Sequence, residues 1–163
     1  MAKDNAKTNA MRLLDAAGIA YQDHTYPIDD GLLDGISVAD KLSEPYEKVF
    51  KTLLTQGKSG ELYVFVIPVD QDLDLKKAAT AAHEKHIEMA PVKDITKHTG
   101  YVKGGCSPIG MKKLYPTFLE EAALLQDKII FSAGKIGAQI ECAPDDLLAV
   151  TKGEYADLCN GNK

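Results

Sequence analysis

The stretch Glu61-Leu-Tyr-Val-Phe-Val-Ile-Pro-Val69 is the strongest β-strand signal in the chain. β-Branched and aromatic residues fill it almost throughout, which favours a strand that is buried on both faces and ends at Pro68. A second apolar run, Val49-Phe-Lys-Thr-Leu-Leu54, precedes it across a short connection. Because connections of hairpin length dominate after residue 49, the pattern excludes a doubly wound parallel sheet and predicts a mixed, largely antiparallel one.

Local signals predict further strands and helices on both sides of this pair. Apolar or alternating runs predict strands at 19–26, 87–90 and 112–118, with Pro116 confining the last to an edge or a bulge, and a hairpin at 128–132 and 138–142. Caps, helical periodicity, prolines and glycines predict helices at 8–17, 35–42, 72–82, 90–100 and 144–150, followed by a weak helical tail. The sequence therefore predicts an α/β (α+β) fold, in which helices surround a mixed, largely antiparallel sheet or an open barrel.

Length and charge narrow the class of protein. At 163 residues, 45% of them hydrophobic, the chain has the size of one core, so we expect 1–163 to form a single domain. The net charge of -5 argues against a general nucleic-acid coat, whose affinity depends on excess Lys and Arg, and we expect no DNA partner. No apolar run approaches the ~20 residues that span a bilayer, and no leader pattern is present, so we expect a cytoplasmic protein without membrane contact.

Cysteine and histidine spacing indicates neither a disulfide framework nor a metal site. Cys106, Cys142 and Cys159 are odd in number, widely spaced and without a C-x-x-C pair, which suits reduced thiols. His83 and His86 stand three residues apart, unlike the H-E-x-x-H spacing that places two imidazoles on one metal. The sequence therefore predicts no metal and no cofactor.

Thr99-Gly-Tyr-Val-Lys-Gly-Gly-Cys-Ser-Pro-Ile-Gly110 has the composition of a shaped loop, and we call it the glycine loop. Glycine permits close approaches that a Cβ atom forbids, and Pro108 fixes one φ angle. The amides of Gly105, Cys106 and Ser107 are then free to converge on an anion or a developing oxyanion. A tight turn between two strands explains the same glycine pattern equally well.

Lys51 is the one charged residue in the apolar run at 49–54. By the two-residue period of a strand it shares a face with Leu53, where a bare ammonium is costly unless it meets a cleft or a counter-ion. A lysine that snorkels from an edge strand gives the same pattern. The residues alone leave both interpretations open.

Six short motifs stand in order along the chain. They are His24-Thr-Tyr26, the run at 49–54, Leu73-Asp-Leu-Lys-Lys77, Glu88-Met-Ala90, the glycine loop, and the Gly-Lys-x-Gly-x-x-Ile-Glu run at 134–141. In this order and at these separations they resemble the YbaK/EbsC family of aminoacyl-tRNA deacylases, and within it the Cys-tRNA(Pro) deacylase type. That family is related to the editing insertion of bacterial prolyl-tRNA synthetase. The resemblance covers the chain from about Lys7 to Asp157.

The resemblance implies an active site built on the glycine loop and on Lys51. Gly104 and Pro108 match the family's G-x-x-x-P element, which holds the ester between the amino acid and the terminal ribose, and Lys51 matches its active-site lysine. Tyr26 falls at a pocket position, where a half-buried core tyrosine would look the same. Gln139 stands where relatives often carry aspartate, and a glutamine cannot act as a base.

The function that the resemblance implies is trans-editing of mischarged Cys-tRNA(Pro). The catalytic candidates are Lys51, Gly104, Gly105, Cys106 and Ser107, and the substrate-binding candidates are Tyr26, Pro108 and Gln139. In the implied reaction the bound cysteinyl thiol attacks its own carbonyl while backbone amides stabilise the oxyanion, and a thiolactone and free tRNA are released. Expected partners are the acceptor end of aminoacyl-tRNA and prolyl-tRNA synthetase.

Three alternatives stay open from the sequence. The pocket could be sized for another small amino acid, Ala or Ser, because pocket volume is not visible in a sequence. Cys106 could be a protein nucleophile, since its glycine-rich, lysine-flanked loop could lower its pKa, although no dedicated base is visible. The chain could also bind charged tRNA or a synthetase without cleaving anything, an interpretation that only Gln139 favours.

Overall fold

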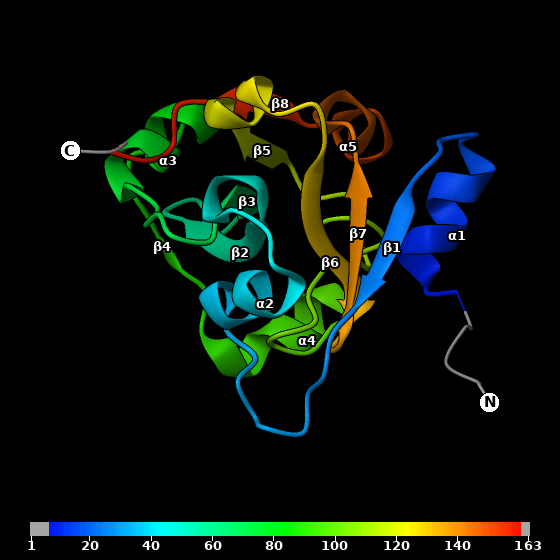
Figure 1. Ribbon diagram of the computed structural model, residues 1–163. Coiled ribbons are helices and arrows are strands. Elements are labelled where there is room, and N and C mark those ends of the chain that lie inside the picture. Colours follow the sequence, from blue (N-terminus) through cyan, green and yellow to red (C-terminus); the bar gives the residue numbers. More distant parts are fainter. Residues whose placement is uncertain (1–6, 161–163) are drawn as a thin grey trace.

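Two β-sheets frame the protein, and the computed structural model describes residues 7–160 (Figure 1). The first sheet has the order β1 (Gln22–Thr25), β7 (Ala138–Cys142), β6 (Ile129–Lys135). The second has the order β4 (Ile87–Met89), β2 (Phe50–Gly57), β3 (Leu62–Pro68), β5 (Thr117–Glu120), β8 (Glu154–Ala156). The expected combination of a mixed sheet and helices is confirmed, and the two sheets do not close into a barrel.

Helices pack around the two sheets. The α-helices are α1 (Asn9–Ala16), α2 (Gly35–Leu42), α3 (Leu75–Ala82), α4 (Ile95–Thr99) and α5 (Pro144–Thr151), and the short 3₁₀ helices are η2 (Tyr46–Lys48), η3 (Val92–Asp94) and η4 (Glu121–Leu125). The sequence predicted the five α-helices. The helix expected over 90–100 is divided between η3 and α4. None of the helices in residues 7–160 has both the length and the apolar character needed to cross a membrane.

Capping residues set the helix boundaries as the sequence indicated. The Thr8 side chain accepts a hydrogen bond from the amide of Met11, and the Asp74 carboxylate accepts from the amides of Lys76 and Lys77. Each of these bonds satisfies an amide that has no partner inside its helix. Gly100 ends α4 with a φ of 86°, a left-handed conformation that costs glycine little.

The β2–β3 hairpin is the centre of the second sheet. The two strands pair in antiparallel register, with Lys51 opposite Ile67 and Thr52 opposite Val66. The prediction of a strand buried on both faces is confirmed, since the residues from Val64 to Ile67 have no exposed surface. Removing such large apolar side chains from water contributes roughly 1.5–3 kcal/mol each.

Two parts of the second sheet differ from the sequence-based prediction. Strand β5 lies inside the sheet, parallel to both β3 and β8, so the expectation that Pro116 confines it to an edge is wrong. Pro116 precedes the strand, and its carbonyl accepts from the Val64 amide, so its missing N–H interrupts no pairing. The segment expected as a helical tail is strand β8.

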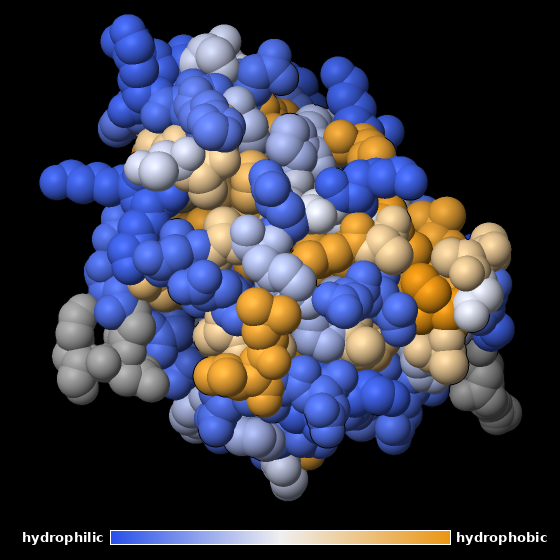
Figure 2. All heavy atoms as spheres, turned by 90° about the horizontal axis from the view of Figure 1, so that it is seen from above, coloured by the Kyte–Doolittle hydropathy of each residue, from blue (hydrophilic) through white to orange (hydrophobic). Residues whose placement is uncertain are grey.

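The core fills the space between the sheets. Its main cluster joins α1 and α5 to side chains of both sheets, among them Phe50, Val66, Phe131 and Ile140. A second cluster lies between the other face of the second sheet and α3. Figure 1 shows α2 between the two sheets, with α1 and α3 on opposite sides of the molecule. On the face seen from above, hydrophobic patches alternate with hydrophilic side chains (Figure 2).

One half of β2 has an open edge. Strand β4 pairs only with Thr55–Gly57, so the half that carries Lys51 has no strand partner on that side among the described residues. In the part of the chain that the structure describes, the two sheets meet there through one isolated parallel bridge, between Val49 and Ile130. Helix α2 covers the junction, and Gly35 lets it approach closely, because a Cβ atom at Gly35 would lie 2.6 Å from Val69 Cγ1. This junction positions the candidate site.

Candidate active site

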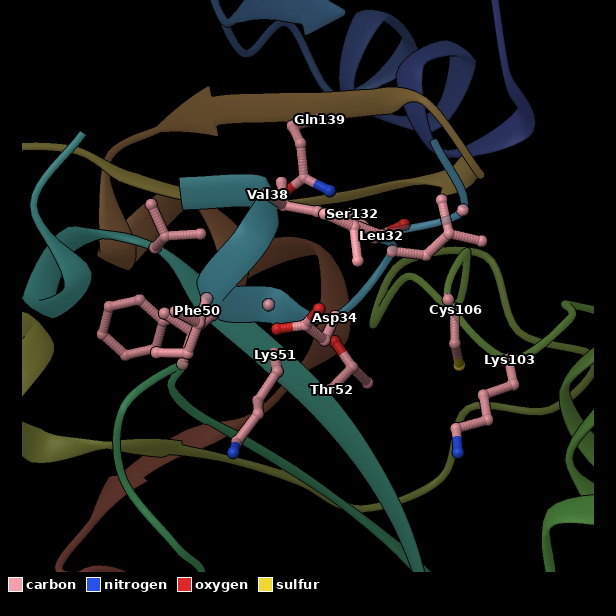
Figure 3. Close-up of a pocket in the computed structure, with 17 residues that line it drawn as sticks. Leu32, Asp34, Val38, Phe50, Lys51, Thr52, Lys103, Cys106, Ser132 and Gln139 are labelled. Carbon is pink, nitrogen blue, oxygen red and sulfur yellow. The ribbon is translucent and has the colours of Figure 1, made fainter. Parts of the chain in front are cut away.

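A cavity of about 770 Å³ opens at the junction of the two sheets (Figure 3). Its walls come from four segments: the start of α2 and the loop before it, the open half of β2, the glycine loop, and strands β6 and β7. The lining residues that carry polar groups or belong to the glycine loop are Asp34, Lys51, Thr52, Lys103, Gly104, Cys106, Ser132 and Gln139. The volume is in the range of pockets that bind small molecules.

Lys51 lines this cavity from β2. It shares a face with Leu53, as predicted, and lies opposite Ile67 of β3. Its ammonium makes no hydrogen bond or ion pair within residues 7–160. In Figure 3 the ammonium groups of Lys51 and Lys103 point to the same side of the cavity, away from Gln139. A pair of cations at one side of a cavity can hold an anionic group there.

The glycine loop contributes Lys103, Gly104 and Cys106 to the cavity wall. The Gly105 amide is not free, because it donates to the Val102 carbonyl at 2.9 Å. The amides of Cys106 and Ser107 make no hydrogen bond within the part of the chain that the structure describes. Of the three amides that the sequence indicated as oxyanion donors, only those of Cys106 and Ser107 are thus free of an internal hydrogen bond within residues 7–160.

The loop is packed tightly against the turn between β6 and β7. A Cβ atom at Gly105 would lie 2.9 Å from the Ile136 amide nitrogen, a distance that real Cβ atoms do not adopt. A Cβ atom at Gly134 would meet the Tyr101 ring at 2.8 Å. These glycines therefore allow the loop to lie directly on the turn, and they fix its place beside β7.

Cys106 has the properties of a neutral thiol. Burial raises its pKa to about 11, and a hydrogen bond with Thr99 lowers it by less. Because the thiolate is the nucleophilic form of cysteine, a thiol with this pKa is almost fully protonated at neutral pH. The structure thus disfavours Cys106 as a nucleophile and leaves its backbone amide as the useful group.

Gln139 lines the cavity from the middle of β7. It pairs in register with Ser132 of β6 and with His24 of β1, and only 5% of it is exposed. Its side-chain amide makes no hydrogen bond within residues 7–160. Figure 3 shows this side chain on the side of the cavity opposite the two lysine ammonium groups. The residue can donate and accept hydrogen bonds but cannot take a proton.

Four predicted site residues do not line the cavity: Gly105, Ser107, Pro108 and Tyr26. Ser107 and Pro108 are buried on the inner side of the glycine loop, and the Ser107 hydroxyl accepts from the Ile109 amide. Tyr26 is buried beside α2, with the Lys41 ammonium 5.8 Å from its ring centroid. Its hydroxyl is buried without a hydrogen-bond partner among the described residues.

Thr52 is a cavity residue that sequence reasoning missed. Its hydroxyl oxygen is buried and has no hydrogen-bond partner among the described residues. Leaving such a group unpaired costs roughly 1–3 kcal/mol, which a polar ligand can recover. The available signal was its position directly after Lys51 in a strand. No cluster of His, Cys, Asp or Glu suited to a metal ion occurs within residues 7–160.

Comparison with known proteins agrees with this arrangement. The sequence profile of the aminoacyl-tRNA editing domain family matches residues 35–150, a range that carries Lys51, the glycine loop and Gln139. The chain belongs to this family. The matched range leaves out α1, β1, β8 and the last residue of α5, and it contains all the other helices and strands given above.

Two known proteins align with most of the chain or with part of it. A protein of Enterococcus faecalis, provisionally named Cys-tRNA(Pro)/Cys-tRNA(Cys) deacylase EbsC, is 45% identical over 156 residues, which is 96% of this chain and 95% of that protein. A proline–tRNA ligase of Fervidobacterium nodosum is 32% identical over 75 residues, 46% of this chain but 13% of the ligase.

A solved structure shows the same fold. It is described as a candidate trans-editing enzyme for prolyl tRNA synthetase, and it superposes with a TM-score of 0.81 at 24% identity. The superposition covers 96% of this chain and 100% of the chain in that structure. At this identity the likeness supports the fold alone.

Proposed function

We propose that this chain, acting as a single editing domain, is a trans-editing aminoacyl-tRNA deacylase that clears mischarged Cys-tRNA(Pro). The observation that carries the proposal is the cavity between the sheets, which Lys51 lines together with the glycine-loop residues Lys103, Gly104 and Cys106. The family and the name of the Enterococcus faecalis relative support the same activity.

An aminoacyl ester is already activated, so the protein needs to position it and to stabilise the oxyanion. The backbone amide of Cys106 is the candidate donor at the cavity wall, the Ser107 amide lies behind it in a fully buried residue, and Gly104 shapes the wall. Loss of one such donor typically costs ~3 kcal/mol of barrier, so one preorganised amide already supplies a substantial part of the catalysis. In this proposal Gly105 and Pro108 shape the loop from behind and donate nothing to substrate.

The substrate supplies its own nucleophile. The cysteinyl sulfur forms a bond to its own carbonyl carbon, the ester C–O bond breaks, and the thiol proton ends on the ribose oxygen that leaves. The products are a cysteine thiolactone and free tRNA. Effective molarities on the order of 10⁵ M or more for well-placed intramolecular nucleophiles make this route fast enough without a protein nucleophile.

The remaining polar residues orient the two ends of the substrate. Lys51 and Lys103 bind the terminal nucleotide through its ribose or phosphate, at the side of the cavity to which their ammonium groups point. Gln139 bonds to the aminoacyl group at the opposite side, and Tyr26 supports that wall from behind. With the nucleotide held at one side of the cavity and the aminoacyl group at the other, the ester bond lies beside the glycine loop.

The partner in this proposal is the acceptor end of aminoacyl-tRNA, in the cytoplasm. A net charge of -5 makes affinity for tRNA alone weak and sensitive to salt. A prolyl-tRNA synthetase partner would supply the missing affinity and the choice of tRNA.

The test is amino-acid release from tRNA(Pro) charged in turn with cysteine, alanine and serine. The proposal predicts rapid release from Cys-tRNA(Pro) with thiolactone as the first product. Faster release from the alanyl or seryl ester would move the assignment to another small amino acid. Tight binding of all three without release would identify a non-catalytic binding module.

A further inference from the structure

The Glu141 carboxylate joins three segments of the chain. Its Oε1 atom lies 2.7 Å from His24 Nε2, and its Oε2 atom lies 2.8 Å from Lys48 Nζ. Glu44 approaches the same ammonium at 3.7 Å. We call His24, Glu141 and Lys48 the clasp. Their side chains are only 18%, 11% and 23% exposed, so the clasp is largely shielded from solvent.

The clasp lies where the two sheets meet. Glu141 is two residues after Gln139 on β7, so both side chains project from the same face of the strand. Lys48 ends η2 directly before Val49, whose bridge to Ile130 is the isolated pairing between the sheets. Lys51 follows three residues later. The clasp therefore ties the strand that carries Lys51 to the strand that carries Gln139.

None of the three clasp residues lines the cavity. Their effect on a substrate must act through the walls that they hold together. Burial raises the pKa of the Glu141 carboxyl, but hydrogen bonds from Lys48 and His24 outweigh it, so the pKa is lowered overall. The carboxylate is consequently charged at neutral pH and the clasp is intact there.

A shielded ion pair of this kind is a weak source of stability, because desolvation offsets much of its attraction. Ion pairs of this kind are better known for favouring one relative position of the segments that they join. The cavity needs such a selection, because within residues 7–160 the only backbone pairing between the two sheets is the Val49–Ile130 bridge, which joins the residue directly before β2 to β6 and not to β7, the strand of Gln139.

We propose that the His24–Glu141–Lys48 clasp is a positioning device that sets the spacing between Lys51 and Gln139 across the cavity. The inference rests on the proposed deacylase function. The three residues are positioning residues and do not touch the substrate. When the clasp is released, β2 and β7 remain folded but the two walls of the cavity shift relative to each other.

Glu141→Gln tests the clasp, and Glu84→Gln is its matched control. Glu84 also gathers several donors, since its carboxylate accepts from Tyr63 and from the amide and hydroxyl of Ser59. It sits beside the turn at the far end of β2, where Gly57 is six residues from Lys51, or about 20 Å along a strand. Both substitutions remove one carboxylate hub with little change in volume.

We expect Glu141→Gln to lower kcat/KM for Cys-tRNA(Pro) on the order of 10²-fold, the scale of a ~1 Å misplacement of reacting groups. Glu84→Gln should leave kcat/KM near that of the parent, even if it lowers the midpoint of urea unfolding equally. Lys48→Arg should retain most of the activity that Lys48→Met loses. Equal losses in both glutamine variants, or equal losses in both Lys48 variants, would overturn the clasp.

Amide hydrogen exchange gives a readout that needs no activity. In Glu141→Gln, exchange at 50–52 and 138–142 should be faster than in the parent and in Glu84→Gln. Unchanged exchange at these positions would refute the clasp, whatever the kinetics show. If the parent protein releases no amino acid, the proposed function fails while the exchange result still decides the clasp.

Discussion

The Tyr101 hydroxyl donates to the Ile109 carbonyl at 2.6 Å and closes the glycine loop into a ring. Between these two residues lie Lys103, Gly104 and Cys106, the loop residues that line the cavity. The loop therefore holds its shape through its own hydrogen bond and through its packing on the β6–β7 turn. A preorganised wall of this kind is what stabilisation of an oxyanion requires.

Tyr101→Phe should loosen the glycine loop, because it removes the hydrogen bond that closes the loop. The Ile109 carbonyl is buried, and losing its partner should lower the free energy of unfolding by about 1–3 kcal/mol. We expect a clear fall in kcat as well. The matched control is Tyr115→Phe, because the Tyr115 hydroxyl donates to the His98 carbonyl at 2.8 Å outside the loop. Equal kcat in both variants would show that closure of the glycine loop by this hydrogen bond has no catalytic importance.

Lys51→Ala should abolish most of the deacylation. Lys51 lines the cavity and its ammonium makes no hydrogen bond or ion pair within residues 7–160, so its loss removes a contact to substrate and not a structural ion pair. We expect a fall in kcat/KM on the order of 10²-fold, as for loss of a positioning contact. The unfolding midpoint should hardly change. Deacylation at the parental rate would remove Lys51 from the mechanism.

Cys106→Ser should preserve turnover. A thiol whose pKa is raised to about 11 is protonated at neutral pH, and only its backbone amide serves in the proposed reaction. Rates measured from neutral pH to pH 9 should therefore coincide for the variant and the parent. A loss of several orders of magnitude in kcat would reinstate Cys106 as a protein nucleophile.

Acid should remove a stability contribution of Glu141. The pKa of its carboxyl is lowered in the folded state from an ordinary value of 4.5. The contribution is therefore complete above pH 4.5 and is lost as the pH falls through the lower folded value. Urea unfolding should show the gap in stability between the parent and Glu141→Gln shrinking with acid. A gap that stays constant between neutral pH and pH 3 would contradict this account.

The sequence predicted those features that depend on neighbours along the chain. The β-branched run at 61–69 specifies β3, Thr8 and Asp74 cap their helices, and the two-residue period places Lys51 on the face of Leu53. Each of these signals is local, and the packing of the fold agrees with it.

Other features depend on residues that meet only in the folded chain. The parallel pairing of β5 with β3 and β8 leaves no pattern in a short segment, so the tail strand was expected as a helix. The bond from the Gly105 amide to Val102 is set by the loop conformation and not by residue types. The approach of Lys48 to Glu141 joins positions 93 residues apart, as their numbers show.

Turnover of Cys-tRNA(Pro) by a substoichiometric amount of the parent protein tests the central claim most directly. The account predicts that many equivalents of amino acid are released per protein molecule, well above the spontaneous rate, with thiolactone trapped as the first product. Release that stops at one equivalent, or that matches the rate without protein, would contradict it.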